Sequence, residues 1–344
     1  MILLTIAIPT YNRSNYLEKQ LNLLSKLILN YHSVEILVSD NNSIDNTFNV
    51  INLFKNNFKQ INYLKQKNNI GFDSNIFELY NNAKGKFIWF LSDDDFITDG
   101  SLEIVINTIT QFPNLGFATF RGTKKTKNAN LLNSNNYNIY YFPEKKALRE
   151  LFSVICISTL VLRKVHPKID YQSLQKSVYP QLTLALNTLL SYNQFLVINE
   201  QIVTIDPGYV TNDFIKLYCI NPVIAVNNSD LSIKHKTRLI KILSYNVKEF
   251  IKLQFLSRVG FYYSKKPTNL KTALSLISYY KYNFYVLFYT IFILIFTYLP
   301  FPIINLLHKI HILLKNKFSI SKCKIDIIKY QEHKENILSK FSDV

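Results

Sequence analysis

The chain has 344 residues, of which 48% are hydrophobic, so it can bury a large core, and its length predicts about two domains. It contains 40 Lys and Arg against 23 Asp and Glu, and the net charge of +17 indicates an acidic partner: nucleic acid, anionic lipid or a phosphorylated substrate. The three cysteines, Cys156, Cys219 and Cys323, are widely spaced and odd in number. Their spacing excludes a disulfide framework and a zinc motif, and it fits a reducing cytoplasm.

Strand-like apolar runs alternate with helix-length segments in the first part of the chain. We expect strands at Leu3–Ile8, Glu35–Val38, Ile61–Leu64, Phe87–Leu91 and Phe117–Phe120. We expect helices at Tyr16–Leu29, Asn46–Phe54, Ser74–Asn82 and Ser101–Phe112. Because no basic region precedes the first run and no small-residue cleavage site follows it, we interpret that run as a strand rather than a signal peptide. The alternation predicts βαβ units and a mostly parallel α/β sheet with flanking helices.

The pattern is less regular in the rest of the chain. We expect a polar loop at Lys124–Asn138, a strand at Ile155–Leu162, a helix at Leu174–Leu190, and short strands at Gln194–Ile198 and Gln201–Ile205. The composition changes near Pro207, where Lys-rich and aromatic helical segments begin. We therefore place one α/β domain at residues 1–207 and a helical, basic C-terminal region at residues 208–344.

The C-terminal region contains an apolar segment, residues 283–307, without a charged residue. A membrane-spanning helix needs about 20 apolar residues, and this segment reaches that length only by running through Pro300 and Pro302. Lysines flank it on both sides, so they indicate no orientation across a bilayer. We expect the segment to dip into or lie on one leaflet of an anionic membrane surface, with both flanks cytoplasmic. A buried helix is the alternative, and a complete span is less favoured than either.

Three consecutive carboxylates, Asp93, Asp94 and Asp95, follow the strand-like run Phe87–Leu91. Like charges repel one another and strands are depleted in Asp, so folding alone does not explain this cluster. A hard divalent cation takes oxygen ligands and often shares them with the phosphates of a substrate. The cluster therefore predicts a site for a metal and a phosphorylated ligand at the end of a strand.

Polar residues also follow the three preceding strands. In an open α/β sheet, ligands bind outside the carboxyl ends of the strands, so these segments are expected to converge on one crevice. The segments are Pro9–Arg13, Ser39–Thr47 and Asn68–Asp73. Each segment alone fits an ordinary turn or helix cap, but their joint occurrence indicates a binding site.

These motifs, in this order and spacing, resemble the family 2 glycosyltransferases of GT-A fold. The motifs are Pro-Thr-Tyr-Asn-Arg, Val-Ser-Asp-Asn-Asn-Ser-x-Asp-x-Thr, Asn-x-Gly and Leu-Ser-Asp-Asp-Asp. The resemblance covers roughly residues 1–205 and is specific over the first hundred. Within the family, the chain is similar to bacterial surface-polysaccharide enzymes, including abequosyltransferase-like proteins of O-antigen assembly. The resemblance implies transfer of a hexosyl or deoxyhexosyl group from a nucleotide-diphospho-sugar to a hydroxyl of a lipid-linked glycan.

The first strand tip is expected to bind the nucleotide. By the resemblance, Pro9, Thr10 and Tyr11 line the nucleotide pocket with main chain and an aromatic face. Arg13 reaches a phosphate or a base, or else it is a solvated helix start. For Tyr11, packing on the sheet edge is the alternative.

The next two tips are expected to shape the nucleotide site. Asp40 is the expected base reader, because a carboxylate accepts hydrogen bonds from a pyrimidine edge; an Asx turn is the alternative. Asn42 is grouped with the nucleotide-binding residues, but holding the loop is the favoured role for Asn42 and Asp45, and Asp45 is also a candidate cap for the following helix. Asn69 and Gly71 permit a close approach to the nucleotide, or form a simple turn.

The resemblance divides the acidic triplet between ribose and metal. It places the ribose at Asp93 and a Mn²⁺ or Mg²⁺ ion at Asp95, with Asp93 also in the candidate metal set and Asp94 as an alternative ligand. Such an ion bridges the two phosphates and acts as a Lewis acid toward the departing diphosphate.

The general base is the part of the family pattern that this chain lacks. Inverting family members use an acidic residue late in the domain, at the start of a helix. Here that stretch contains Gln181, which is no base. Asp170 is the first candidate, and whether transfer inverts or retains configuration stays open. The other acids nearby are Glu144, Glu150, Glu200 and Asp206.

Two further alternatives follow from the same observations. A non-catalytic scaffold of the same fold is consistent with Gln181. Nucleic-acid binding follows from the net charge, but dispersed lysines and acidic strand tips disfavour it. The basic pair Arg163 and Lys164 is expected either to meet acceptor phosphates or to be a surface pair. The leading expectation is a metal-dependent enzyme on the cytoplasmic face of a bacterial membrane, peripheral or monotopic, and without a nucleic-acid partner.

Overall fold

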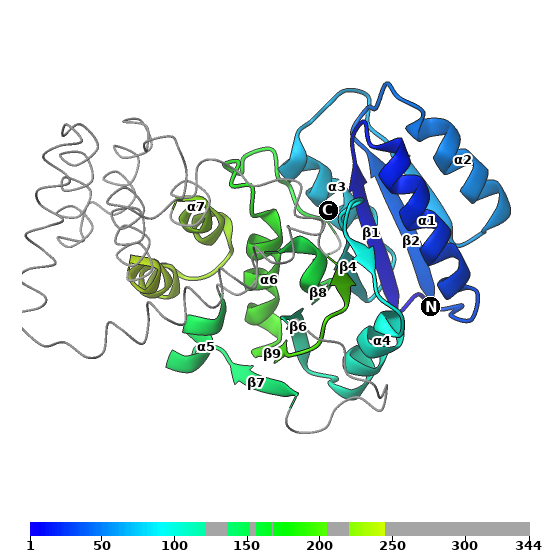
Figure 1. Cartoon of the computed structure of the whole chain (residues 1–344). Helices are drawn as coiled ribbons and strands as arrows, with labels where there is room; N and C mark the ends of the chain where they lie inside the picture. Colours follow the sequence, from blue (N-terminus) through cyan, green and yellow to red (C-terminus); the bar gives the residue numbers. More distant parts are fainter. Residues whose placement is uncertain (122–135, 152–155, 167, 205–219, 245–344) are drawn as a thin grey trace, which may run out of the picture.

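The computed structural model of the chain describes residues 1–121, 136–151, 156–166, 168–204 and 220–244 (Figure 1). In this part of the chain, helices cover both faces of an eight-stranded mixed sheet in the order β3-β2-β1-β4-β8-β6-β9-β7. The apolar segment 283–307, most of the predicted loop and Asp206 lie outside the described residues, as does the predicted domain boundary. Among the helices that are described, none is both long and apolar enough to cross a membrane.

The first half of the sheet confirms the predicted alternation. Its four strands run parallel, with β1 between β2 and β4 and with β3 as the outermost strand. The elements are β1 (Leu4–Thr10), α1 (Ser14–Ile28), β2 (Val34–Asp40), α2 (Thr47–Asn57), β3 (Ile61–Lys65), α3 (Phe72–Asn82) and β4 (Phe87–Phe90). Because these strands are parallel, their carboxyl ends lie along one edge of the sheet, which we call the carboxyl edge. The opposite edge, where these strands begin, is the amino edge.

The second half of the sheet is mixed. Strand β8 runs antiparallel to β4 and β6, β9 runs parallel to β6, and β7 runs antiparallel to β9. A separate pair joins β5 and β10. The elements are β5 (Phe96–Ile97), α4 (Ser101–Gln111), β6 (Leu115–Phe120), β7 (Tyr137–Tyr141), α5 (Lys145–Glu150), the 3-10 turn η2 (Ile157–Thr159), β8 (Leu160–Arg163), α6 (Pro180–Ser191), β9 (Gln194–Ile198), β10 (Val203–Thr204) and α7 (Asn221–Asn228).

Several predicted boundaries were wrong, including that of the strand expected at Gln201–Ile205, which begins only at Val203. The expected strand at Ile155–Leu162 begins only at Leu160, because residues 157–159 form a 3-10 turn. The helix expected from Leu174 begins at Pro180, since proline favours a first helical position and Val178 just before it has a left-handed φ of 59°. The expected loop ends early, because Tyr137 already pairs with β9.

Two hydrophobic cores form on the two faces of the sheet (Figure 1). Helices α1, α2 and α4 pack on one face, where Trp89 of β4 is fully buried. Helices α3, α5, α6 and α7 pack on the other, around Phe117 and Phe195. All seven residues of β1 and of β2 are buried, as expected for parallel strands covered on both faces. Polar side chains are therefore accommodated at the strand ends.

The interpretation of Arg163 and Lys164 as a surface pair was wrong for Arg163. Arg163 is 3% exposed, and its guanidinium donates to the main-chain oxygens of Leu115 (2.7 Å) and Pro113 (2.6 Å). Lys164 Nζ donates to the carbonyl of Ala83 (2.7 Å), just after α3. Arg163 pairs with the first residue of β4, so the pair lies at the amino edge. Both cations donate to main-chain carbonyls at this edge, Arg163 in a buried position and Lys164 in a half-buried one.

Candidate functional site at the carboxyl edge

The sheet register brings the strand tips together. Thr10, the last residue of β1, pairs with Asp40, the last residue of β2. On the other side of β1, the amide of Leu91 donates to the carbonyl of Ala7 (3.0 Å), which places the acidic triplet beside Thr10. The predicted convergence of Thr10, Asp40 and Asp93 is thus a consequence of parallel pairing around β1.

Asp93 is the most constrained member of the triplet. Its carboxylate is 3% exposed and accepts hydrogen bonds from the Thr10 hydroxyl (2.7 Å) and from Arg13 Nη1 (3.1 Å). Burial raises the pKa of Asp93 to about 6, although the hydrogen bond from Thr10 and the charge of Arg13 act in the opposite direction. At neutral pH this residue is therefore a buried, ionised carboxylate, and a nearby cation stabilises its negative charge.

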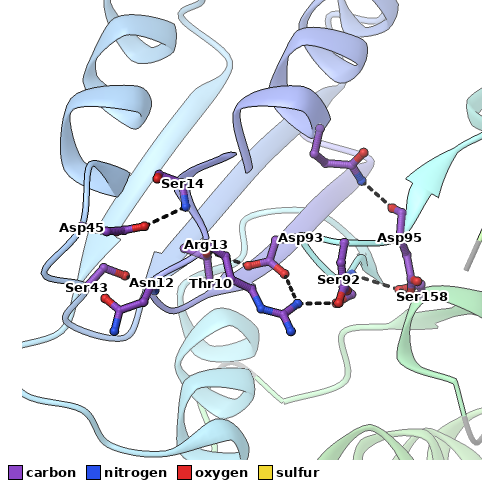
Figure 2. Close-up of polar contacts among 12 residues, drawn as sticks. Thr10, Asn12, Arg13, Ser14, Ser43, Asp45, Ser92, Asp93, Asp95 and Ser158 are labelled. Carbon is purple, nitrogen blue, oxygen red and sulfur yellow. Dashed lines mark hydrogen bonds and ion pairs between the residues drawn. The ribbon is translucent and has the colours of Figure 1, made fainter. Parts of the chain in front are cut away.

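Arg13 is the cation that this structure places against the triplet (Figure 2). Its Nη1 atom forms ion pairs with both Asp93 and Asp94, and Asp94 also accepts a hydrogen bond from the Ser92 hydroxyl. Burial acts to lower the pKa of Arg13, but the hydrogen bonds and charges of the two carboxylates outweigh it and raise that pKa. A solvated helix start, one of the two interpretations of Arg13, is not what the structure shows.

Asp95 has a different set of partners. It is 6% exposed, and its carboxylate accepts a hydrogen bond from the Ser158 hydroxyl (2.6 Å), as Figure 2 shows. Its main-chain oxygen accepts a hydrogen bond from the Gln20 side chain of α1 (2.8 Å). Ser158 is oriented in turn by Trp89, whose ring nitrogen donates to the Ser158 carbonyl (2.8 Å). Burial, followed by the charge of Asp95, raises the pKa of the nearby Cys156 thiol to about 11, so this thiol is neutral at physiological pH.

Asp40 is fully buried and already forms internal hydrogen bonds. One carboxylate oxygen accepts the amide of Ser43 (2.8 Å), and the other accepts the Tyr63 hydroxyl (2.9 Å). The amide of Ser43 is three residues after Asp40, one position beyond the contact of an Asx turn, so the carboxylate closes a wider loop after β2. Each carboxylate oxygen has two lone pairs, so recognition of a pyrimidine edge stays a prediction beside this structural role.

The loops after β2 and β3 are joined to each other. Asn69 Oδ1 accepts hydrogen bonds from the Asn41 side chain (3.0 Å) and from the Gly71 amide (3.0 Å). Gly71 has a φ of 85°, which glycine adopts without steric strain. Asn42 has a φ of 67°, a conformation that asparagine tolerates better than most residues. Asn69 and Gly71 thus build a defined turn at the carboxyl edge.

The loop after β2 is also tied to the start of α1. Asp45 accepts hydrogen bonds from the Ser14 amide (2.9 Å) and the Thr47 amide (3.1 Å), which confirms that it holds the loop and the first turn of α2. Pro9 is buried within β1, whereas Tyr11 is 43% exposed beside it. The Tyr11 ring is therefore accessible to a ligand.

Asp170 is not brought to the strand tips. It is exposed, and the adjacent Ile169 exchanges hydrogen bonds with Asn81, near the C-terminal end of α3. Gly71 precedes the other end of that helix, so an 11-residue helix, about 16 Å long, separates the two. No acidic residue occurs in the first turn of α6, where Gln181 is 2% exposed. The structure therefore adds no support for Asp170 as the base.

Two of the three other candidate acids in the described ranges have structural partners. Glu144 is the residue before α5 and makes no side-chain capping hydrogen bond, whereas Glu150 forms an exposed ion pair with Arg121 (2.6 Å). Glu200 is 1% exposed and accepts a hydrogen bond from Asn136 (2.9 Å). The general base thus stays unassigned among these residues.

The chemistry of the triplet fits a cation that is shared with a ligand. In the ranges described, no group of three or more His, Cys, Asp and Glu side chains is arranged to hold a metal ion by itself. The carboxyl edge supplies the carboxylate oxygens of Asp93, Asp94 and Asp95, and carboxylates are hard ligands. Mn²⁺ or Mg²⁺ that takes one or two carboxylates and completes its shell with phosphate oxygens suits such a set.

Sequence reasoning missed two residues that contact Asp95 directly but lie far from it in the sequence. Ser158 lies 63 positions after Asp95 in the chain, and Gln20 lies 75 positions before it. Neither stands in a recognisable motif, and no sequence pattern pointed to either residue. Asn41 was part of a quoted motif, and its position after β2 was the available signal for its role in joining the two loops.

Comparison with known proteins identifies the domain. Residues 5–169 match the model of Glycosyl transferase family 2. The chain is 35% identical over 105 residues to abequosyltransferase RfbV of Salmonella typhimurium, which is 30% of this chain and 32% of that protein. It is 34% identical over 116 residues to the GalNAc(5)-diNAcBac-PP-undecaprenol beta-1,3-glucosyltransferase of Campylobacter jejuni, which is 33% of this chain and 36% of that protein. The aligned part thus spans about a third of the length of these curated relatives.

Solved structures share the fold at low identity. TarS from S. aureus, solved as residues 1–349 in complex with UDP-GlcNAc, has a TM-score of 0.56 and 15% identity, covering 81% of this chain and 80% of that one. Mannosyltransferase PcManGT from Pyrobaculum calidifontis, solved with GDP-Man and Mn²⁺, has a TM-score of 0.50 and 13% identity, covering 85% and 86%. By its family match, its strand-tip motifs and its fold, the domain that contains residues 5–169 belongs to glycosyl transferase family 2 of GT-A fold.

Proposed function

We propose that the chain transfers a hexosyl or deoxyhexosyl group from a nucleotide-diphospho-sugar to a hydroxyl of a lipid-linked glycan. One observation carries this proposal: parallel pairing around β1 gathers Thr10, Arg13 and the acidic triplet at one point of the carboxyl edge. Family membership supports the reaction class. The curated relatives, one named for an abequosyl group and one for an acceptor on PP-undecaprenol, support a bacterial surface-polysaccharide acceptor.

In this proposal, different residues of the carboxyl edge bind different parts of the donor. The exposed Tyr11 ring and the main chain of Pro9 and Thr10 form one side of the nucleotide pocket, and Asp40 is proposed to read a pyrimidine edge. The Asn69–Gly71 turn allows the nucleotide to approach the main chain closely. Asp93, fixed by Thr10, is proposed to bind the ribose.

In this proposal, Arg13 and a divalent cation together balance the negative charges of the acidic triplet. Arg13 offsets the repulsion between Asp93 and Asp94, and we propose that it also contacts a phosphate of the donor. We propose that Asp95, with Asp93 or Asp94 beside it, holds Mn²⁺ or Mg²⁺. When bound, the ion neutralises charge on the departing diphosphate. Ser158 fixes the carboxylate of Asp95, so the protein orients this ligand in advance.

We also propose that the basic C-terminal region associates with the cytoplasmic face of a bacterial membrane. Its apolar segment 283–307 and the flanking lysines support binding to anionic lipid. Co-sedimentation with anionic and neutral vesicles tests this, with residues 1–244 as a truncated comparison. Equal recovery of both chains with anionic vesicles would contradict the membrane role.

A non-catalytic scaffold is the second candidate, and Gln181 favours it. This amide stands in the first turn of α6, where inverting family members carry an acid, and that turn has no acidic residue. A scaffold binds the donor but neither hydrolyses nor transfers it. Release of nucleoside diphosphate with an added glycan acceptor separates the two candidates.

The decisive experiment is a thermal-shift screen of UDP-, dTDP-, CDP- and GDP-sugars with Mn²⁺. A ligand that binds only the folded state must raise the melting temperature by mass action. We expect one pyrimidine nucleotide-sugar to stabilise the protein, and to stabilise it less when EDTA removes the ion. Absence of stabilisation by every nucleotide-sugar, with and without the ion, would overturn the proposed function.

A further inference from the structure

The loop before α6, residues 175–179, is fastened to α3 through Asp73. This carboxylate is 8% exposed and lies in the first turn of α3. It accepts hydrogen bonds from the amide of Ser177 (2.6 Å), the hydroxyl of Ser177 (3.3 Å) and the amide of Val178 (3.0 Å). A buried carboxylate that accepts several main-chain amides fixes the loop strongly, because the alternative is an unpaired buried charge.

The other side of the same loop is fastened to α7. Asn228, the last residue of α7, accepts the amide of Gln175 (3.3 Å) and donates to its carbonyl (2.7 Å). The main chain is thus anchored at the residue before Lys176 and at the residue after it. Val178 has a φ of 59°, a conformation that is rare and costly for a β-branched residue. Such strain persists only where surrounding contacts impose it, and it clusters at functional sites.

This double anchoring carries Lys176 to the carboxyl edge. The Nζ atom of Lys176 lies 3.5 Å from the position that a Cβ atom on Gly71 would occupy. Gly71 belongs to the turn that Asn69 closes and that is joined to the loop after β2. The exposed ammonium group therefore stands beside the strand tips, although it comes from a segment about a hundred residues later in the chain.

A cation at this position would balance negative charge that Arg13 alone does not balance. Arg13 already forms ion pairs with Asp93 and Asp94, so much of its charge is neutralised. A nucleoside diphosphate brings further negative charge to the same edge. We infer that Lys176 binds the diphosphate of the donor and that Asp73 is a positioning residue, which acts by holding the loop that presents this lysine. The inference rests on the proposed use of a nucleotide-sugar donor.

The test compares binding of a nucleoside diphosphate with binding of its nucleoside. Of UDP, dTDP and CDP with Mn²⁺, the one that stabilises the wild type most is titrated by calorimetry, as is the matching nucleoside. We expect Lys176→Met to weaken diphosphate binding about tenfold or more, because a charge-assisted hydrogen bond is lost. Nucleoside binding should stay unchanged, and Lys176→Arg should retain most of the affinity.

Asp73→Asn tests the positioning role. It should weaken diphosphate binding about as much as Lys176→Met does. The double variant should bind at most about twofold more weakly than Lys176→Met alone, because both changes remove the same contact. Glu35→Gln is the matched control. Glu35 is also a buried carboxylate that accepts a main-chain amide, that of Lys84 (2.7 Å), but it lies at the amino edge. Its loss should lower stability without changing affinity.

The outcomes are distinct. If no nucleoside diphosphate binds the wild type, the proposed function fails and the inference fails with it. If the wild type binds but Lys176→Met binds equally well, only the inference is overturned. If Lys176→Met weakens binding while Asp73→Asn behaves like Glu35→Gln, the positioning role of Asp73 is wrong. Lys176 is exposed, so its substitution should not prevent folding. The result for Lys176 can therefore be interpreted even if Asp73→Asn fails to fold.

Discussion

The two edges of the sheet both contain buried charged residues, but they use them differently. At the amino edge, Glu35, Arg163 and Lys164 each bond to main-chain groups of neighbouring segments. At the carboxyl edge, the charges of Arg13, Asp93 and Asp94 face one another. The amino-edge charges, which are satisfied by main chain, fasten the fold. Opposed side-chain charges can exchange partners when a charged ligand arrives.

The largest effect is expected at Asp95, where the carboxyl edge is proposed to hold the metal. Asp95→Asn should lower kcat by about 100- to 1000-fold, because a preorganised electrostatic contact to the leaving group is lost. Release of nucleoside diphosphate at saturating Mn²⁺ measures the loss. Asp99→Asn, an exposed carboxylate four positions later, is the control and should retain activity. More than half of the wild-type rate in Asp95→Asn would rule out this role.

Substitution of one arginine at each edge tests the difference between the edges directly. Arg13→Ala should lower the free energy of unfolding by about 1–3 kcal/mol at pH 8, because Asp93 is left buried and uncompensated. The loss should be smaller at pH 5, where Asp93, with a pKa of about 6, is mostly protonated. Urea unfolding at both pH values measures the difference.

Arg163→Ala is the matched variant at the amino edge. It should also destabilise the protein, since two carbonyls lose their donor, but by the same amount at both pH values. A loss for Arg13→Ala that is equally independent of pH would remove the distinction between the two edges.

A smaller effect is expected from Ser158→Ala. The change removes the hydroxyl that donates to Asp95 and should raise the Mn²⁺ concentration for half-maximal activity about tenfold. Ser25→Ala removes a different buried hydroxyl, one in α1 that has no place in the proposed site, and should leave the Mn²⁺ requirement unchanged. A Mn²⁺ titration of activity in both variants decides the matter, and identical curves would show that Ser158 does not orient the metal ligand.

The last effect concerns the dependence of stability on pH. The folded pKa of Asp93, about 6, lies above the ordinary value of 3.8, so the folded state binds this proton more tightly than the unfolded state. The free energy of unfolding should therefore fall as pH rises from about 4 to about 6, by at most about 1.4 kcal/mol per pH unit. Asp93→Asn should remove that slope. A difference between wild type and variant that stays constant from pH 4 to pH 7 would contradict the raised pKa.

Local sequence patterns were sufficient to specify the alternating architecture of the first half and the strand tips of the site. Apolar runs and turn residues specify parallel βαβ units, and parallel strands must end at one edge. Thr10, Asp40 and Asp93 could therefore be placed together from their motifs alone. The 3-10 turn at 157–159 and the start of α6 could not, because their boundaries depend on distant packing and hydrogen bonds that override local propensity.

Which charges face one another was decided by tertiary contacts. The sequence indicated that the acidic triplet needs a cation, and the structure places Arg13 against Asp93 and Asp94 while Asp95 turns to Ser158. It also showed that Arg163 and Lys164 bind main chain, and it brought Lys176 to the Gly71 turn. These contacts join segments tens of residues apart, so the energy that selects them arises only once the chain has folded.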